Sequence, residues 1–346
     1  MTRPTRAPSA TDAAGSSGAV MNKKLGFTAM LLSATGMGFV GTFGRLSTPL
    51  KDDGSRYIIG DFLAFGRMTF GVIGFLVILL LVKKLPKLRS TRLSFAIIAG
   101  GLSIGASLAL YVSSTLMTSI ANAVFLIYTG PLVSAVLARI FLKERISLRN
   151  GLFLVLVFIG MLMTIGLINY TPETGLTIGL ELGSDPAFPN KALGDLFGLG
   201  SGVFYGLALF FYRYRGDVDS EVRGFWNFLF GAIGALIVMV CRITWLDSTN
   251  PVEVMAPSNW AWAIGMFLFC GFFAIGFLVV AGKHLPAVEL STVSYWECVV
   301  ALLLGLLLWS EPMTLIGAIG GMLILGGGLL PIVIELVVRK PQGAAA

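Results

Sequence analysis

The sequence predicts an all-α integral membrane protein with ten transmembrane helices, arranged as two inverted five-helix repeats with both termini cytoplasmic. Composition indicates the class, long apolar runs indicate the helices, and similarity between the two halves indicates the repeat. Of the 346 residues, 56% are hydrophobic and 12% are charged, and the mean hydropathy is +0.86. Soluble domains carry about 25% charged residues, so this composition excludes a soluble enzyme, a nucleic-acid-binding protein and a small disulfide-bonded secreted domain.

Apolar runs follow one another along most of the chain, separated by short polar breaks. A transmembrane helix needs about 20 consecutive apolar residues, so each run is predicted to be one span. The predicted spans lie near residues 25–46, 60–82, 94–114, 121–142, 150–168, 192–213, 222–246, 258–282, 288–309 and 313–337. The third and fourth are the least clearly separated, because only residues 115–119 lie between their apolar cores.

The segments outside these runs complete the domain organisation. Residues 1–24, rich in Ala, Ser, Thr, Pro and Gly, are expected to form a disordered cytoplasmic tail, and residues 339–346 a second cytoplasmic tail. The connection 169–191 contains three prolines and several acidic residues and is expected to be an external linker. It separates the first five-helix repeat, 25–168, from the second, 192–338.

Basic residues predict the orientation. If the N-terminus is cytoplasmic, 18 of the 25 Lys and Arg residues fall in cytoplasmic segments. Only three fall in external segments: Lys51, Arg56 and Lys191. The others lie within spans or at their ends: Arg45, Arg67, Arg139 and Arg242. Because cytoplasmic loops are enriched in Lys and Arg, this distribution predicts that both termini are cytoplasmic.

The two halves are similar to each other at a nearly constant spacing. Matched pairs include Gly38 with Gly206, Arg45 with Arg213, Tyr128 with Tyr295 and Glu144 with Glu311. Because each half has five spans, the second half is expected to cross the membrane in the opposite orientation. The charges agree, since Lys143-Glu144-Arg145 of the first half corresponds to Ser310-Glu311-Pro312 of the second. Inverted repeats recur in secondary transporters, although channels also contain them.

Small residues recur every four positions on one face of span six: Gly194, Gly198, Gly202 and Gly206. Such a face allows close helix approach, and we interpret it as a packing seam.

Several motifs resemble a known family. Ala121-Asn122-Ala123 opens span four, Gly194-Asp195 opens span six, and Ser310-Glu311-Pro312 follows span nine. With the repeat, they make residues 25–338 similar to the ten-helix branch of the drug/metabolite transporter superfamily, which is built from two EamA-type repeats. Within it the chain looks most similar to bacterial exporters of amino acids, particularly aromatic ones. One position departs: relatives have Glu-Pro where this chain has Glu297-Cys298, so span nine is expected to be less interrupted here.

Two charged residues lie well inside predicted spans, far from the span ends, where charges are costly and often functional. Glu297 is near the centre of span nine. One interpretation is functional: Glu297 binds the amino group of a substrate or titrates during transport. The other is structural: Glu297 is a protonated carboxyl held by hydrogen bonds to neighbouring helices. The adjacent Tyr295 and Trp296 favour the first interpretation. Arg67 in span two either attracts a substrate carboxylate or anchors two helices by hydrogen bonds, and we favour the anchor.

Aromatic residues complete the predicted substrate site. Tyr111, Tyr128, Tyr205, Trp226, Tyr295 and Trp296 offer ring faces and polar tips suited to an aromatic or bulky amino acid. Each residue taken alone is more often a packing or interfacial residue. Pro131 leaves a backbone carbonyl of span four free for a substrate or water. Trp309, at the end of span nine, is assigned to the interfacial aromatic belt.

The sequence contains no Walker loop, dinucleotide fingerprint, metal-spaced His/Cys set or nucleophile elbow, so neither an enzyme nor a cofactor is expected. Cys241, Cys270 and Cys298 lie in separate apolar runs and are interpreted as packing residues. Glu144 and Glu311 are interpreted as structural residues that pair with or cap neighbouring helix ends. His284, beside Lys283, is interpreted as an interfacial residue.

The resulting prediction is an inner-membrane secondary transporter that exports amino acids and related metabolites by alternating access through a central cavity. Its expected partners are the small-molecule substrate and the lipid bilayer, with no nucleic acid; a monomer is compatible with the sequence. The alternatives are a transporter of nucleotide sugars or phosphorylated sugars and, ranked lower, a channel. An anionic sugar phosphate would require several cavity bases, whereas only Arg67 is clearly intramembrane.

Overall fold

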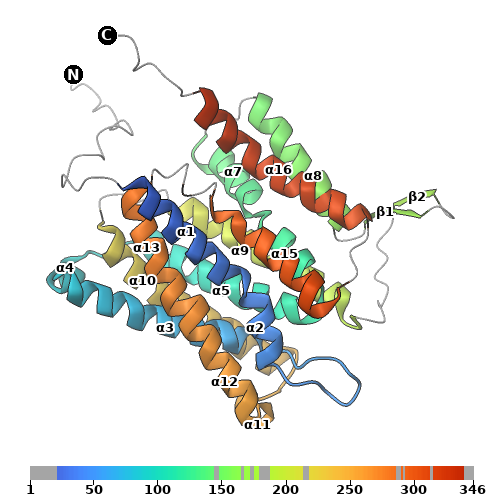
Figure 1. The fold of residues 1–346 in the computed structure, drawn as a ribbon, viewed down its shortest axis with the longest axis horizontal. Coiled ribbons are helices and arrows are strands. Elements are labelled where there is room, and N and C mark those ends of the chain that lie inside the picture. Colours follow the sequence, from blue (N-terminus) through green and yellow to red (C-terminus); the bar gives the residue numbers. More distant parts are fainter. Residues whose placement is uncertain are drawn as a thin grey trace.

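The computed structural model describes residues 22–143, 148–164, 167–171, 175–178, 188–212, 218–285, 290, 293–311 and 315–338, which are mostly helical (Figure 1). The helices are α1 (Lys23–Gly38), α2 (Val40–Ser47), α3 (Gly60–Leu81), α4 (Leu85–Ser90), α5 (Phe95–Met117), α6 (Ile120–Ile127), α7 (Gly130–Phe141), α8 (Leu148–Thr164), α9 (Lys191–Phe211), α10 (Ser220–Trp245), α11 (Pro251–Val254), α12 (Pro257–Met266), η2 (Phe267–Phe273), α13 (Ala274–His284), α15 (Trp296–Trp309) and α16 (Leu315–Val338). The strands are β1 (Ile168–Thr171) and β2 (Gly175–Ile178).

The helices have the length and composition of membrane spans. Within the described residues, seven helical segments are long and apolar enough to cross a membrane. They are Lys23–Ser47, Gly60–Leu81, Phe95–Met117, Ile120–Phe141, Lys191–Phe211, Glu221–Trp245 and Pro257–Gly282. Three shorter apolar helices cover Gly151–Thr164, Trp296–Trp309 and Leu315–Gly327. The chain is therefore a multi-pass membrane protein.

Corresponding helices of the two halves pack antiparallel. Asp61, in the first turn of α3, pairs with Arg242 in the last turn of α10. At the other end of the same two helices, Glu221 in the first turn of α10 pairs with Lys84, just beyond α3. Each helix therefore begins where its counterpart ends. The last helices of the two halves, α8 and α16, also lie side by side (Figure 1).

The first helix of each half packs on the fourth span of the other half. A Cβ added to Gly38 of α1 would lie 2.7 Å from Val300 of α15, and one added to Gly206 of α9 would lie 2.5 Å from Val133 of α7. The two contacts are equivalent under the repeat, because Val133 and Val300 are corresponding residues. Neither position has room for a side chain, so Gly206 acts in the packing seam predicted for span six.

The boundary between spans three and four differs from the prediction. α5 continues to Met117 instead of ending near residue 114, and α6 begins at Ile120. The extra turn of α5 is stabilised by Arg45, which donates to the carbonyl of Thr115 at 2.9 Å. That contact joins residues 70 positions apart in the chain and is not visible in the local sequence.

The connection between the halves contains an antiparallel hairpin of β1 and β2, with Asn169 opposite Thr177. The expectation of a purely α-helical chain is wrong in this detail. Tyr170 and the threonines of these strands are residue types that favour extended structure. Gly175, the first residue of β2, has φ +70°, a left-handed conformation that glycine adopts without steric cost.

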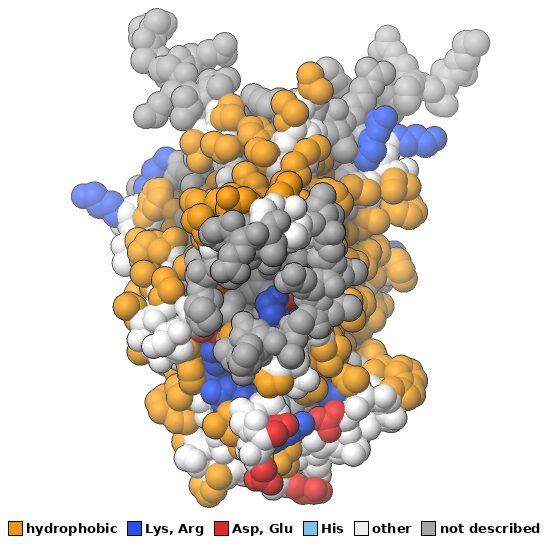
Figure 2. Space-filling view, turned by 90° about the vertical axis from the view of Figure 1, so that its right-hand side faces the viewer, with side chains coloured by type: hydrophobic (Ala, Val, Ile, Leu, Met, Phe, Trp, Pro, Cys, Tyr) orange, Lys and Arg blue, Asp and Glu red, His pale blue; other side chains and the backbone are white. Residues whose placement is uncertain are grey.

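In the view of Figure 2, hydrophobic side chains cover much of the surface, and most of the visible Asp and Glu side chains lie at its lower end. Large hydrophobic side chains are exposed along the helices, among them Leu81 and Phe95 at 77% each. We call the end where α2, α5 and α10 terminate and α6 and α9 begin the linker face. We call the opposite end the terminal face, because α1 begins and α16 ends there (Figure 1).

Candidate functional site

Several spans are interrupted along their length. Phe39 separates α1 from α2, Tyr128 and Thr129 separate α6 from α7, and Tyr295 directly precedes α15. Phe39, Tyr128 and Tyr295 all pack against one buried hydrophobic cluster. Within a membrane, non-helical backbone is tolerated where it is buried in protein or lines a cavity, so these interruptions mark the candidate site. Span nine has a turn at Tyr295, directly before the helix that carries Glu297 and Cys298.

A carboxylate lies between the interrupted helices of the two halves. Glu297 is in the first turn of α15, where the partial positive charge of the helix N-terminus favours an anion. The Tyr128 hydroxyl donates to Oε2 of Glu297 at 3.2 Å. The rings of Tyr128 and Tyr295 lie 5.2 Å apart between centroids, at 36°. Because the two tyrosines are corresponding residues, both halves contribute equivalent aromatic groups beside the single carboxylate.

Arg67 joins α3 to η2, the π-helical part of predicted span eight. Its side chain is buried, and its Nε donates to the carbonyl of Cys270 at 3.2 Å, while Nη2 contacts the sulfur of Met37. Cys270 lies in the π-helix η2, whose wider turns alter the regular backbone pairing and often occur at functional sites. Arg67 is also close enough to Glu297 for electrostatic attraction. The arrangement is that of an interhelical anchor, as favoured from the sequence.

Two further predicted tyrosines belong to the same site. Tyr111 of α5 and Tyr205 of α9 pack in the same hydrophobic cluster, and both are within electrostatic range of Glu297. The hydroxyl of Tyr111 is buried and has no hydrogen-bond partner among the described residues. Pro131, near the start of α7, lacks the N–H that would bond to the carbonyl of Ile127. The structure thus gathers these predicted residues around Glu297: Arg67, Tyr111, Tyr128, Tyr205 and Tyr295, with Pro131 at the adjoining interruption.

The two predicted tryptophans have other neighbours. Trp226 stacks on Phe230 of its own helix, with ring centroids 5.9 Å apart and an interplanar angle of 23°. Trp296 is 41% exposed, and its indole nitrogen donates to Thr35 Oγ1 of α1 at 3.1 Å. Helical geometry explains the second case, because Trp296 and Glu297 are adjacent and must point in different directions. The structure thus places Trp296 against α1, and its role in substrate binding stays a prediction.

A second polar centre lies at the linker face, around the turn between α5 and α6. Arg45 donates through Nε to the carbonyl of Thr115 and through Nη2 to that of Thr118, both at 2.9 Å. Glu311 forms an ion pair with Arg45 and accepts the Ile120 N–H at 2.9 and 3.1 Å. The cation thus meets the negative end of α5 and the anion meets the positive end of α6. The structural role predicted for Glu311, pairing and helix capping, agrees with this geometry.

Two family motifs meet beside this centre. Asn122 of α6 donates to Asp195 of α9, and Asp195 also pairs with Lys191 in the preceding turn. Asn122 donates to Thr118 Oγ1 as well, at 3.1 Å. The polar residues that open spans four and six are therefore parts of one network that fixes the two helix starts to each other.

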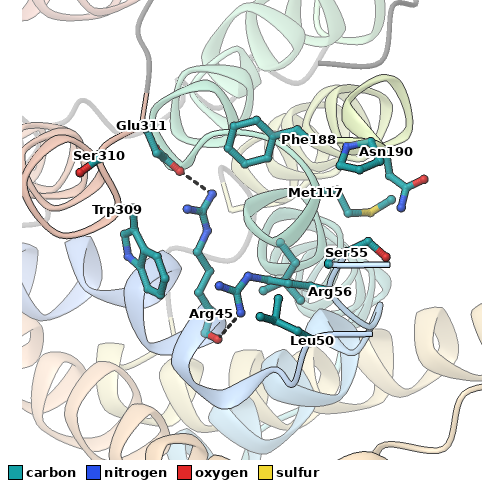
Figure 3. Close-up of a pocket in the computed structure, with 13 residues that line it drawn as sticks. Arg45, Leu50, Ser55, Arg56, Met117, Phe188, Asn190, Trp309, Ser310 and Glu311 are labelled. Carbon is teal, nitrogen blue, oxygen red and sulfur yellow. Dashed lines mark hydrogen bonds and ion pairs between the residues drawn. The ribbon is translucent and has the colours of Figure 1, made fainter. Parts of the chain in front are cut away.

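Beside the Arg45–Glu311 pair lies a cavity of about 230 Å³ (Figure 3). The Cζ atom of Arg56 lies 5.2 Å from the Trp309 ring centroid, and that of Arg45 lies 5.3 Å from it. Arg56 donates through Nη1 to the carbonyls of Arg45 and Thr48, at 2.8 and 3.1 Å. Burial, followed by the charge of Arg45, lowers the pKa of Arg56 to about 10. The lining residues are Arg45, Leu50, Gly54, Ser55, Arg56, Leu116, Met117, Phe188, Pro189, Asn190, Trp309, Ser310 and Glu311.

The sequence prediction missed this cavity. Arg56 was counted only as one of three external bases, and the assignment of Trp309 to the interfacial belt is incomplete because its ring lies over two guanidinium groups. One signal was available: Trp309 directly precedes the Ser310-Glu311-Pro312 motif. Its contacts depend on α2 and on the loop after it, and span composition does not predict them.

Other predicted residues lie elsewhere or outside the described part of the chain. Glu144 and Arg213, the counterparts of Glu311 and Arg45, are outside the described residues. His284 lies at the terminal face, where Nδ1 accepts the Asn22 N–H at 3.4 Å. Among the described residues, no group of three or more His, Cys, Asp and Glu side chains is arranged to hold a metal ion.

Comparisons with known proteins identify the family. The sequence pattern of the EamA-like transporter family matches residues 24–166 and again residues 192–332. The chain belongs to the EamA-like transporter family. A search of curated proteins gives no match. A solved structure described as "Crystal structure of protein" is similar with a TM-score of 0.54 and 18% identity, covering 92% of this chain and 98% of that one. At this identity the similarity concerns the fold, which extends over both EamA repeats.

Proposed function

We propose that this EamA-like protein is a secondary transporter that exports amino acids, with a preference for aromatic or bulky neutral ones, from the cytoplasm. It crosses the inner membrane ten times, with both termini cytoplasmic, so the linker face is external. The seven long apolar helices and three shorter ones among the described residues support this number of spans. The excess of basic residues in the segments at the terminal face supports this orientation.

One observation carries the substrate proposal: Tyr128 of the first half donates to Glu297 of the second, at the point where both helices are interrupted. An α-amino group is a compact cation that a buried carboxylate binds well, and the tyrosine rings offer an apolar surface to a side chain. Because the site lies between the halves, movement of one half against the other exposes it alternately to the two faces.

Arg67 weighs against a sugar phosphate as substrate. Its guanidinium is occupied by the carbonyl of Cys270 and the sulfur of Met37, and it lies within range of the opposite charge of Glu297. A phosphate group would meet a carboxylate and tyrosine rings in the same site. We therefore favour a zwitterionic substrate.

The test is counterflow in proteoliposomes that contain only this protein, loaded with unlabelled phenylalanine and supplied with labelled phenylalanine outside. Wild-type protein and Glu253→Gln, which removes an exposed acid near α11, are expected to give saturable, trans-stimulated uptake. Glu297→Gln is expected to lower uptake at least about tenfold, since an interaction with a charged group contributes about 1.5–3 kcal/mol. Uptake of a sugar phosphate but of no amino acid would disprove the substrate, and uptake that never saturates would indicate a channel.

A further inference from the structure

The cavity at the linker face has room for a small molecule. The cavity volume of about 230 Å³ is several times the volume of one water molecule in the liquid, roughly 30 Å³. It lies at the ends of α2, α5 and α15 and is separate from the residues around Glu297. Figure 3 shows the guanidinium of Arg56 beside Arg45, in the middle of the lining side chains.

The charges that line the cavity are unbalanced. Arg45 and Arg56 contribute two positive charges, and Glu311 contributes the only negative charge among the lining residues. Glu311 pairs with Arg45. Among the residues that the structure describes, no carboxylate forms an ion pair with Arg56, which donates through Nη1 to two backbone carbonyls. Within the described part of the chain, the cavity therefore holds one guanidinium without a counter-ion.

This guanidinium is poorly solvated. Burial and the nearby Arg45 lower the pKa of Arg56 to about 10, so it remains protonated at neutral pH. A guanidinium presents a planar fork of N–H donors that matches a carboxylate. The Trp309 ring lies against both arginines, and its buried indole N–H has no acceptor among the described residues. The cavity thus offers donors for an anionic oxygen together with an aromatic wall.

We propose that this cavity binds the carboxylate of a small apolar carboxylic acid, which pairs with Arg56 and competes with Glu311 for Arg45. If the proposed function holds, this ligand is the exported amino acid at the external face. When Arg45 turns to the ligand, Glu311 still accepts the Ile120 N–H. After the exchange, both the Glu311 carboxylate and the ligand carboxylate therefore have a hydrogen-bond donor. Carboxylate binding therefore weakens the ion pair that links α2 to the end of α15.

The experiment measures binding of phenylacetate to the purified full-length protein in micelles by isothermal titration calorimetry. Phenylacetamide has nearly the same shape without the charge and is the matched ligand control. Arg56→Gln is compared with Lys51→Gln, which removes a positive charge from the same loop but does not line the cavity. Phenylacetate is expected to bind wild type and Lys51→Gln alike and Arg56→Gln at least tenfold more weakly, whereas phenylacetamide is not expected to bind. Equal binding of the amide, or unchanged binding by Arg56→Gln with a wild-type unfolding midpoint, would overturn the proposal.

Glu311→Gln tests the competition. Without a carboxylate to hold Arg45, phenylacetate is expected to bind at least threefold more tightly than to wild type. Unchanged or weaker binding would show that Glu311 does not compete with the ligand. The counterflow assay separates this proposal from the proposed function: Arg56-dependent binding without amino-acid counterflow retains the cavity and rejects the transport proposal. Counterflow without phenylacetate binding does the reverse.

Discussion

Replacing Arg242 by methionine removes one partner of an ion pair that joins α3 to α10 inside the bundle. Nε of Arg242 donates to Oδ2 of Asp61 at 2.7 Å, and the two side chains are only 4% and 1% exposed. Without Arg242, the donors left to the Asp61 carboxylate among the described residues are backbone N–H groups, such as that of Phe62 at 2.9 Å. Removing one partner of a buried pair costs about 3–5 kcal/mol, because the remaining charge is buried and uncompensated. We expect Arg242→Met to lower the free energy of unfolding by that amount.

The opposite end of the same two helices supplies a control pair. There Lys87 of α4 pairs with Asp219, just before α10, and the two side chains are 60% and 32% exposed. Exposed pairs contribute about 0–1 kcal/mol, so Lys87→Met is expected to cost no more than that. Asp61→Asn should fall between the two, because Arg242 keeps the carbonyls of Asp247 and Thr249 as acceptors.

The assay is equilibrium unfolding of the purified protein in mixed micelles, followed by tryptophan fluorescence. A double-variant cycle with Asp61→Asn and Arg242→Met measures the coupling, and the double variant is expected to lose less stability than the sum of the two single losses. Equal costs for Arg242→Met and Lys87→Met would refute the argument that burial determines the contribution of these pairs.

Two further predictions concern packing and pH. Gly105→Ala is expected to destabilise the protein by about 1–3 kcal/mol, because its Cβ would lie 1.9 Å from the carbonyl oxygen of Gly231. A Cβ at Gly276 would meet nothing within 4 Å, so Gly276→Ala is the control and should be nearly neutral in the same unfolding assay. Asp219, at the terminal face, has its pKa held below its usual value chiefly by hydrogen bonding to Lys87 and Lys84. Its contribution, about 0–1 kcal/mol, is therefore present above its unfolded pKa of about 3.9 and lost as pH falls through the lower folded value. The difference in unfolding midpoint between wild type and Asp219→Asn should be constant from about pH 8 to pH 5 and close below about pH 4; an unchanged difference at low pH would contradict this assignment.

The apolar runs and the repeat were predictable from the sequence for a physical reason: a membrane span must be long and apolar, and small packing residues recur at fixed positions. The motif residues Asn122, Asp195 and Glu311 were also visible, because polar groups at span ends are few. Their partners were not visible. Arg45 caps α5 from 70 residues away, and nothing near Thr115 in the chain announces that contact.

Among the helix interruptions, too, some could be predicted from the sequence and others depend on tertiary contacts. Pro131 signals the interruption between α6 and α7, because proline lacks an N–H. Phe39 lies in a run with no proline, and the π-helix η2 has an ordinary apolar sequence. One carbonyl of η2 is bound by Arg67 of another span, so its local geometry depends on a tertiary contact. For the same reason, Trp296 was predicted beside Glu297 from adjacency, whereas the direction of each side chain separates them.

The distribution of buried charge between the two faces bears on how the protein changes conformation. Among the described residues, the ion pairs in which both side chains are at most 6% exposed, Arg45–Glu311 and Asp61–Arg242, lie at the linker face. At the terminal face, Lys87 and Asp219 are 60% and 32% exposed, so water can replace each partner at little cost, and Lys84 keeps 32% exposure beside the buried Glu221. Separating a buried pair leaves an uncompensated charge unless another ion replaces the lost partner. Opening the linker face through α2 and α15 therefore requires a replacement for Glu311 beside Arg45. On our proposal the substrate carboxylate provides it, so opening of this face is favoured when substrate is bound, as an exporter requires.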